Sequence, residues 1–197
     1  MTRYLYLTRH GEATPDERGL TEQGRRQAEL LGERLQGVPF AAVHHGPLPR
    51  AAQTAHLIAE RLPGVPLRVC DVAGDYVPNV PDEGVLPPDL ARFLDRFPTE
   101  EHRPDLARQA LDLFTGPVEG TRHELVVTHN FLIGWLVRAA LDAPEWRWLG
   151  LNQANAALTV IRYTQGRPPS LLVYNDMAHL PAELQWTGFP PELRLES

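Results

Sequence analysis

Short apolar runs alternate with longer segments of helical periodicity along most of the chain. The short runs predict strands at 4–8, 40–44, 67–69, 124–128, 156–163 and 171–174. The longer segments predict helices at 21–35, 47–62, 88–97, 103–114 and 131–141. A Gly-Arg-Pro-Pro turn at 166–169 joins the last two strands as a hairpin. This order is typical of an α/β three-layer sandwich, with a mostly parallel sheet flanked by helices and at least one antiparallel strand.

The length of 197 residues favours a single domain over 1–197. Residues 71–89 are rich in Pro, Gly and Asp, and they form a longer stretch than a plain connection needs. We expect this loop and the helices after it, to about residue 118, to form an insertion that supplies part of the wall of a functional site.

Composition narrows the class of protein. The hydrophobic content of 43% is ordinary for a globular chain, and the net charge of −6 argues against general binding of nucleic acid or anionic membranes. Cys70 is the one cysteine, so no internal disulfide forms, and no run approaches the roughly 20 apolar residues of a membrane span. Arg9 and His10 interrupt the first apolar run too early for a signal peptide. These features predict a cytoplasmic protein.

Cationic and titratable side chains follow several of the predicted strands. Arg9 and His10 end the first strand, Arg50 comes soon after the second, and His129 ends the run at 124–128. Ligands of open α/β sheets bind outside the carboxyl ends of the strands, so these side chains meet in one pocket if their strands are neighbours. Arginine offers planar, bidentate hydrogen bonds that fit phosphate. The pattern predicts a site for a phosphate dianion.

A histidine in such a pocket can attack phosphorus directly and divide one hard step into two easier ones. Its attacking nitrogen must be unprotonated, which an ordinary pKa of about 6.5 permits near neutral pH. The leaving alkoxide needs a proton, so a carboxylic acid is expected near the pocket mouth. The candidates are Glu12 beside the first motif and, in the 71–89 loop, Asp71, Asp75, Asp82 and Glu83.

Five motifs together resemble the histidine phosphatase, or phosphoglycerate-mutase-like, superfamily. They are Arg9-His10-Gly11-Glu12, Leu20-Thr21-x-x-Gly24, Arg50-Ala51-x-Gln53-Thr54-Ala55, Thr128-His129 and Tyr174-Asn175-Asp176-x-Ala178-His179-Leu180. They occur in the family's order over nearly the whole chain. The resemblance implies a phosphoglycerate-mutase-like fold. It also implies that His10 becomes phosphohistidine and that Arg9, Arg50 and His129 hold the phosphoryl oxygens.

The resemblance also bears on the acid. Gly74-Asp75-Tyr76-Val77-Pro78 is similar to the branch in which an acidic residue precedes a Pro-rich loop, which implies Asp75 as the acid, with Glu83 second. Asn130 stands where the acid-phosphatase branch has an aspartate, so that position cannot supply the proton. Glu12 is expected to orient the first motif. His45-Gly46 replaces a Ser-Ser pair of the family, which makes His45 a further candidate for the pocket.

The sequence therefore predicts a metal-independent phosphatase that hydrolyses a phosphomonoester, on a small molecule or a protein, and needs no cofactor. His10, His44 and His45 lack the usual spacing of zinc ligands. The alternatives are a phosphoglycerate-mutase-type phosphotransferase and a non-catalytic phosphate-binding module. Such a module would be expected to lack His10, Arg9 or His129, and all three are present. No nucleic-acid or membrane partner is expected, and the sequence leaves the substrate and the oligomeric state open.

Overall fold

A six-stranded sheet forms the centre of the molecule. The computed structural model describes residues 1–82 and 84–194. The strands are β1 (Thr2–Arg9), β2 (Phe40–His45), β3 (Leu67–Val69), β4 (Thr121–Thr128), β5 (Leu158–Thr164) and β6 (Ser170–Asp176), in the order β3-β2-β4-β1-β5-β6. The first four in this order are parallel, whereas β5 runs antiparallel to both β1 and β6. The predicted mostly parallel sheet with an antiparallel hairpin is confirmed.

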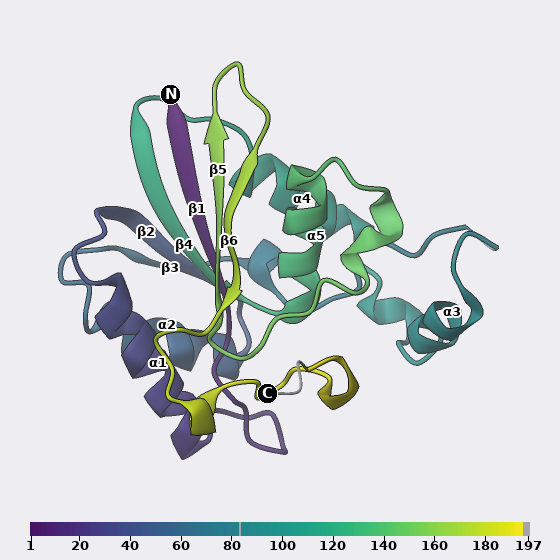
Figure 1. Ribbon diagram of the computed structural model, residues 1–197, viewed down its shortest axis with the longest axis horizontal. Coiled ribbons are helices and arrows are strands. Elements are labelled where there is room, and N and C mark those ends of the chain that lie inside the picture. The colour runs from purple at the N-terminus through teal and green to yellow at the C-terminus, as the bar shows by residue number, and fades with distance from the viewer. Residues whose placement is uncertain (83, 195–197) are drawn as a thin grey trace.

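Helices cover both faces of this sheet and complete the predicted three-layer sandwich (Figure 1). The helices are α1 (Glu22–Leu35), α2 (Pro49–Ala59), α3 (Pro88–Leu94), α4 (Pro104–Phe114) and α5 (Asn130–Ala140). α1 and α2 pack on one face, α4 and α5 on the other, and α3 projects away from the sheet. No helix in the described part of the chain is long and apolar enough to cross a bilayer.

The central strands are apolar on both faces because helices cover both. Leu125 and Val127 of β4 belong to the core under α1 and α2, whereas Val126 between them belongs to the core under α4 and α5. Successive side chains of a strand point to opposite faces, so a strand buried on both sides becomes a continuous apolar run. This run ends at the carboxyl edge of the sheet, where the polar side chains begin.

Several element ends differ from the sequence prediction for local reasons. α2 ends at Ala59 instead of 62 because the next amides bond three residues back, as in Leu62 N–H to Ala59 O, and the chain tightens. β5 starts at Leu158 instead of 156 because Ala156 has a φ of +52°, which a strand cannot contain. β4 starts earlier, at Thr121, because its polar first residues pair with the start of β1.

Close backbone packing fixes the loop that follows β1. A Cβ on Gly11 would lie 2.4 Å from the carbonyl oxygen of Gly24, and a Cβ on Gly24 would lie 2.1 Å from that of Glu12. Only glycine permits this approach between the loop and the first turn of α1. Thr21 caps that turn by accepting the Gly24 N–H at 2.9 Å. The Thr21-x-x-Gly24 motif therefore packs closely against the loop after β1 and holds the end of β1 in place.

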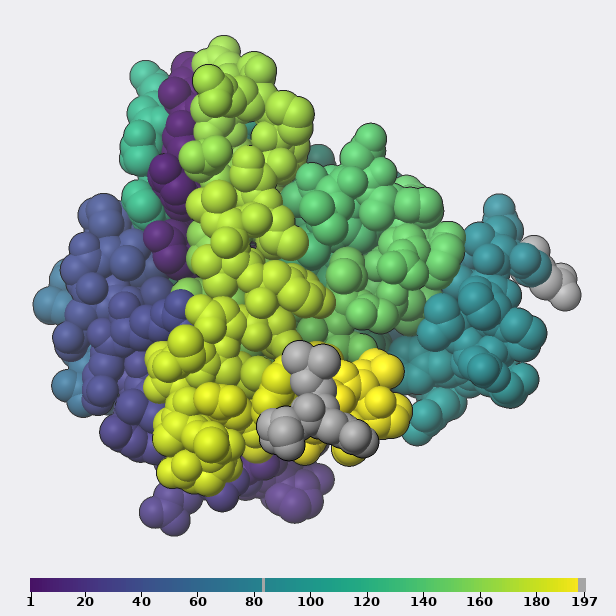
Figure 2. Space-filling view, viewed as in Figure 1, coloured from purple at the N-terminus to yellow at the C-terminus, as the bar shows by residue number. Residues whose placement is uncertain are grey.

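The segment after β6 lies across the carboxyl end of the parallel strands. Figure 2 shows it on the molecular surface, between the side formed by α1 and α2 and the side that carries α3. Leu180 and Leu184 of this segment are buried in a small apolar cluster of their own. The chain thus returns at its end to the edge of the sheet at which Arg9 and His10 lie.

Candidate active site

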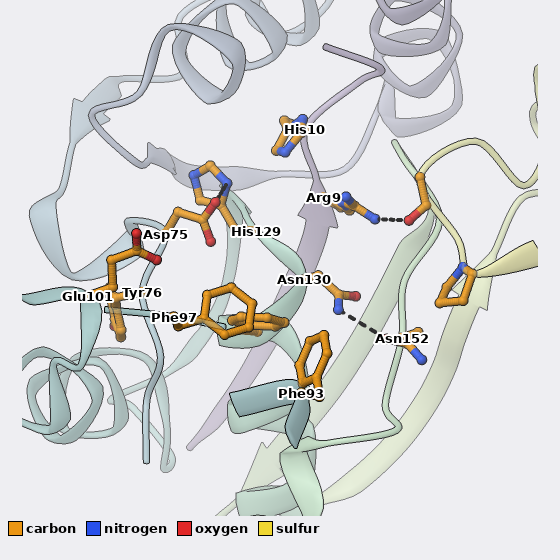
Figure 3. A pocket seen from close by; sticks show the side chains of 13 residues that line it. Arg9, His10, Asp75, Tyr76, Phe93, Phe97, Glu101, His129, Asn130 and Asn152 are labelled. Atoms are coloured by element: carbon orange, nitrogen blue, oxygen red, sulfur yellow. Dashed lines mark hydrogen bonds and ion pairs between the residues drawn. The ribbon is translucent and has the colours of Figure 1, made fainter. Parts of the chain in front are cut away.

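The carboxyl ends of β1 and β4 open into a cavity of about 290 Å³ (Figure 3). Its polar side is formed by Arg9, His10, Asp75 and His129. Its other wall is largely aromatic and is formed by Tyr76, Phe93, Phe97 and Phe131. In Figure 3, Phe93 and Phe97 lie across the cavity from His10. The geometry brings together the histidines that sequence analysis placed at two different strand ends.

Two hydrogen bonds define the tautomer and orientation of His10. Its Nδ1 lies 2.8 Å from the carbonyl oxygen of Gly11, and Arg50 Nε donates to its Nε2 at 3.2 Å. An arginine only donates, so Nε2 must offer a lone pair, and Nδ1 carries the proton. Burial, together with the nearby His129 and Arg9, holds the pKa of His10 well below its usual value. His10 is therefore neutral near pH 7, and its nucleophilic Nε2 is unprotonated and accepts from Arg50 in the free protein.

Arg9 is held by the loop before β5 and by the segment after β6. Its Nη1 donates to the carbonyl oxygens of Gln153, at 2.9 Å, and of Gly188. Burial lowers the pKa of Arg9 to about 10, so the guanidinium stays charged at neutral pH. A Cβ on Gly188 would lie 2.3 Å from Asn155 Oδ1 and 2.8 Å from Arg9 Nη1, at a φ of +67°. Glycine is therefore required at 188 for the tail to hold Arg9.

Arg50 connects the nucleophile to two carboxylates. Its Nη2 lies 2.7 Å from Asp75 Oδ2 and its Nη1 lies 3.2 Å from Glu17 Oε2. The Arg50 side chain is buried, whereas that of Asp75 is 37% exposed at the cavity mouth. The arginine lies in the first turn of α2, where the positive end of the helix dipole adds to its charge. An anion in the cavity would compete with both carboxylates for this guanidinium.

His129 is buried beside His10, and the two ring centroids are 5.0 Å apart. Burial, with Arg50 and Arg9 nearby, lowers the pKa of His129 to about 3, so the ring is neutral. Its Nδ1 lies 3.3 Å from Asp75 Oδ2, which is a polar contact rather than an ion pair because the ring carries no charge. Within the described residues neither ring nitrogen has a well-directed hydrogen bond. A phosphoryl oxygen can supply that partner.

Two further candidate residues lie outside this cavity, and a third is not among the residues that the structure describes. Glu12 accepts from Thr21 Oγ1 at 2.7 Å and borders a neighbouring hollow rather than this cavity. His45 does not line the cavity, because alternation along β2 directs it toward α2, where its ring centroid lies 5.9 Å from that of His56. Glu83 lies outside the described residues.

Sequence analysis missed the groups that support the backbone of β1. Asn155 Nδ2 donates to the carbonyl oxygen of His10 at 2.8 Å, and Ala156 N–H donates to that of Arg9 at 3.0 Å. His179 Nε2 lies 3.1 Å from Ala156 O, and Arg34 lies 3.0 Å from His179 Nδ1, so Nε2 carries the proton and donates. His179 belongs to the C-terminal motif, which was the available sequence signal for this support.

The described part of the chain holds no cluster of three His, Cys, Asp or Glu side chains that would suit a metal ion. Positive charge comes from Arg9, which lines the cavity, and from Arg50, which lines the neighbouring hollow and reaches His10 and Asp75 from there. Both can direct several N–H groups at one phosphoryl group, because a guanidinium carries five donors in a plane. The chemistry that this arrangement supports is nucleophilic attack by His10 on an anion held by arginine.

Stability should fall as the pH drops below about 6.5, the pKa of a histidine in the unfolded chain. The folded-state pKa is about 3 for His129 and about 4 for His179, and that of His10 is also depressed. Between the folded and unfolded pKa of each histidine, the unfolded chain binds more protons than the folded one. Each histidine therefore lowers the free energy of unfolding by up to about 1.4 kcal/mol per pH unit of acidification. Above about pH 7 the contribution of these histidines to the free energy of unfolding is constant.

Urea unfolding at pH 7, 6 and 5 would measure this loss. A His179→Gln variant keeps a side-chain donor for Ala156 but removes one titrating group. Its stability should therefore fall less steeply with acidification than that of the wild type. Equal midpoints for the wild type at pH 7 and pH 5 would contradict the assignment of neutral, buried histidines.

The chain resembles known proteins over almost its whole length. The family profile described as histidine phosphatase superfamily (branch 1) matches residues 5–72 and 87–177. Pgam5 of Caenorhabditis briggsae, a mitochondrial serine/threonine-protein phosphatase, is 32% identical over 196 residues, which cover 94% of this chain and 68% of that protein. Pgam5 of Drosophila melanogaster is 27% identical over 212 residues, covering 98% of this chain and 69% of the relative.

Solved structures give the same picture of the fold. YhfR of Bacillus stearothermophilus superposes with a TM-score of 0.65 at 25% identity, over 90% of this chain and 98% of that protein. A phosphoglycerate mutase of Plasmodium falciparum superposes with a TM-score of 0.62 at 20% identity, over 93% and 96%. The fold is thus similar to that of YhfR and to that of a phosphoglycerate mutase.

The prediction of a cytoplasmic location is wrong. The curated relatives from Caenorhabditis, Drosophila and Mus are named as mitochondrial enzymes. The prediction rested on the single cysteine and on the absence of a long apolar run. Those features argue against a disulfide-rich secreted protein, but they do not distinguish one reducing compartment from another.

Proposed function

Because the chain belongs to the histidine phosphatase superfamily, whose members are metal-independent hydrolases, we propose that this phosphatase acts through a phosphohistidine on His10. The observation that carries the proposal is the state of His10. Its ring is neutral and fixed at Nδ1, and it presents the Nε2 lone pair beside a buried arginine. This is the arrangement that nucleophilic attack on an anionic phosphoryl group requires.

In the first step, His10 Nε2 attacks phosphorus as the bond to the leaving oxygen breaks. Arg9, Arg50 and His129 hold the non-bridging oxygens, and the charge that builds on them is stabilised by donors already in place. The phosphoryl group takes the Arg50 donor that Asp75 occupies in the free protein. A dianion beside Asp75 favours its protonated form, and this carboxyl gives its proton to the leaving alkoxide.

In the second step, water attacks the phosphohistidine. Asp75, now ionised, takes a proton from this water, the N–P bond breaks, and inorganic phosphate leaves with His10 neutral again. Asp75 is partly exposed at the cavity mouth, so it can reach both the leaving group and the incoming water. Each cycle consumes one phosphomonoester and one water and produces one alcohol and one phosphate.

We also propose that residues 71–118 serve as an insertion within a single domain and form one wall of the site. Tyr76, Phe93, Phe97 and Glu101 all come from this segment and line the cavity, which supports the proposal. The substrate is a phosphomonoester of a small molecule or a protein. Because relatives of this chain are named as protein phosphatases, phosphoproteins should be tested as substrates. The acidic net charge supports the prediction that no nucleic acid or membrane takes part.

Release of p-nitrophenolate and phosphate from p-nitrophenyl phosphate, with EDTA present, tests this function. We expect turnover that is the same with and without EDTA, with one phosphate released per p-nitrophenolate. A requirement for an added divalent ion would contradict the proposed chemistry, because the cations at the cavity are arginines. Transfer of the phosphoryl group to an added alcohol in preference to water would indicate a mutase-type enzyme instead.

A further inference from the structure

A second hollow, of about 230 Å³, adjoins the catalytic cavity. The two share five lining residues, namely Phe93, Asn130, Phe131, Asn152 and Pro190. Beyond these the second hollow is bordered largely by apolar side chains, among them Leu90, Trp148, Leu149 and Leu193. Because both hollows border Phe93 and Phe131, a molecule held at His10 can extend from one into the other.

Aromatic rings form a continuous wall that runs along both hollows. Phe97 packs edge-to-face on Phe93 at 5.2 Å and on Phe131 at 5.3 Å, and Phe131 packs on Trp148 at 4.9 Å between ring centroids. These rings support one another, so the wall is fixed before any ligand arrives. Such preformed aromatic surfaces bind apolar groups at low cost in conformational entropy.

The charge of the second hollow excludes one class of ligand group. Among the described residues that line it, Glu192 is the only charged side chain and none is cationic. The amide of Asn130 is already used, since its Oδ1 accepts the Gln153 N–H at 2.6 Å and its Nδ2 donates to Asn152 at 3.2 Å. A second phosphate or a carboxylate on the substrate would therefore find no counter-charge there.

The aromatic wall also lies on the side that the leaving group must occupy. In-line displacement places the leaving oxygen on the far side of phosphorus from the attacking nitrogen. Figure 3 shows Phe93 and Phe97 across the cavity from His10, with Arg9, Asp75 and His129 around the space between them. A phosphoryl group bound by the polar side thus directs its alcohol part toward the aromatic wall.

We propose that this aromatic hollow is the subsite for the leaving group, and that the substrates are phosphomonoesters of alcohols carrying a compact apolar or aromatic group. The inference rests on the proposed function, because the phosphoryl group must first be held at His10. The volume suits one ring with a short linker, since an apolar cavity of about 150 Å³ already accepts benzene.

The test compares ethyl phosphate with 2-phenylethyl phosphate. The ring of the second substrate is two carbons away from the ester oxygen, so the leaving alcohols differ little in acidity and mainly in apolar surface. We expect kcat/KM to be about 10- to 100-fold higher for 2-phenylethyl phosphate. Equal values would overturn the subsite while leaving the proposed function in place. Turnover of neither substrate would contradict the proposed function itself.

Two variants locate the effect. Phe93→Ala and Leu90→Ala should each lower the ratio of the two kcat/KM values at least about threefold, and using both guards against a single variant that folds poorly. Leu113→Ala is the matched control, because Leu113 is an exposed apolar residue on α4 outside both hollows. It should leave both rates unchanged. A ratio that survives both substitutions in folded protein would overturn the proposal.

Discussion

Replacing His10 with alanine is expected to reduce phosphomonoester turnover by at least about 10⁴-fold, the scale of loss seen when a covalent nucleophile is removed. Among the described residues that line the cavity, only His10 has a neutral ring nitrogen that accepts a hydrogen bond from Arg50. The remaining arginines would still bind the anion, so kcat should fall much further than substrate affinity. Initial rates with p-nitrophenyl phosphate measure this loss.

A chemical trap distinguishes loss of the nucleophile from general damage. Wild-type protein mixed with radiolabelled substrate and quenched in alkali, which preserves an N–P bond, should retain label on His10. The His10→Ala protein should retain none. Turnover of the variant above about 1% of wild type would contradict the assignment, since the remaining groups offer no equivalent nucleophile.

His45 provides a closely matched control for this experiment. Like His10, it is buried at the end of a strand, and its Nδ1 lies 2.8 Å from the carbonyl oxygen of the following glycine. It differs in that its side chain packs toward His56 on α2 and does not line the cavity. His45→Ala should therefore keep activity within severalfold of wild type. A loss as deep as that of His10→Ala would show that the two losses share a structural cause.

The ends of strands can be located from sequence, so the side chains that follow them could be predicted to lie at one edge of the sheet. Arg9, His10 and His129 each follow an apolar run, and parallel strands bring such ends to one edge of a sheet. Adjacency of β1 and β4 could not be read from the chain, because Arg9 and its register partner Thr128 lie 119 positions apart in the sequence. The prediction needed that adjacency as an assumption, and the structure supplies it.

The rest of the site depends on contacts that no local pattern records. Gly188, in the segment after β6, accepts from Arg9 through its carbonyl oxygen, whereas Asn155, just before β5, donates from its side chain to the carbonyl oxygen of His10. Neither residue belongs to a motif with its own signal. Phe93 lines the cavity although α3 projects away from the sheet, and its ring lies 6.1 Å from that of Phe131 in α5. Strand alternation explains why His45 does not line the cavity, although its place in the family's Ser-Ser position made it a candidate.

Replacing Asp75 with asparagine is expected to slow the first chemical step by about 10²- to 10⁴-fold for ethyl phosphate, the usual range for removal of a general acid. The same change should slow p-nitrophenyl phosphate far less, because p-nitrophenolate departs without a proton. An asparagine oxygen can still accept from Arg50 Nη2, which Asp75 does at 2.7 Å, so the guanidinium should keep its position. The difference between the two substrates therefore reports proton transfer rather than misplacement of Arg50.

The first step must be measured alone, because Asp75 is also proposed to activate water in the second. A rapid burst of p-nitrophenolate followed by slow turnover is the expected behaviour of Asp75→Asn, since phosphohistidine forms but hydrolyses slowly. Asp71→Asn is the control, as Asp71 is an exposed carboxylate of the same loop that does not line the cavity. Equal slowing of both substrates in the first step would mean that another carboxylate is the general acid. Glu101, which lines the cavity, and Glu83 would then be the residues to replace next.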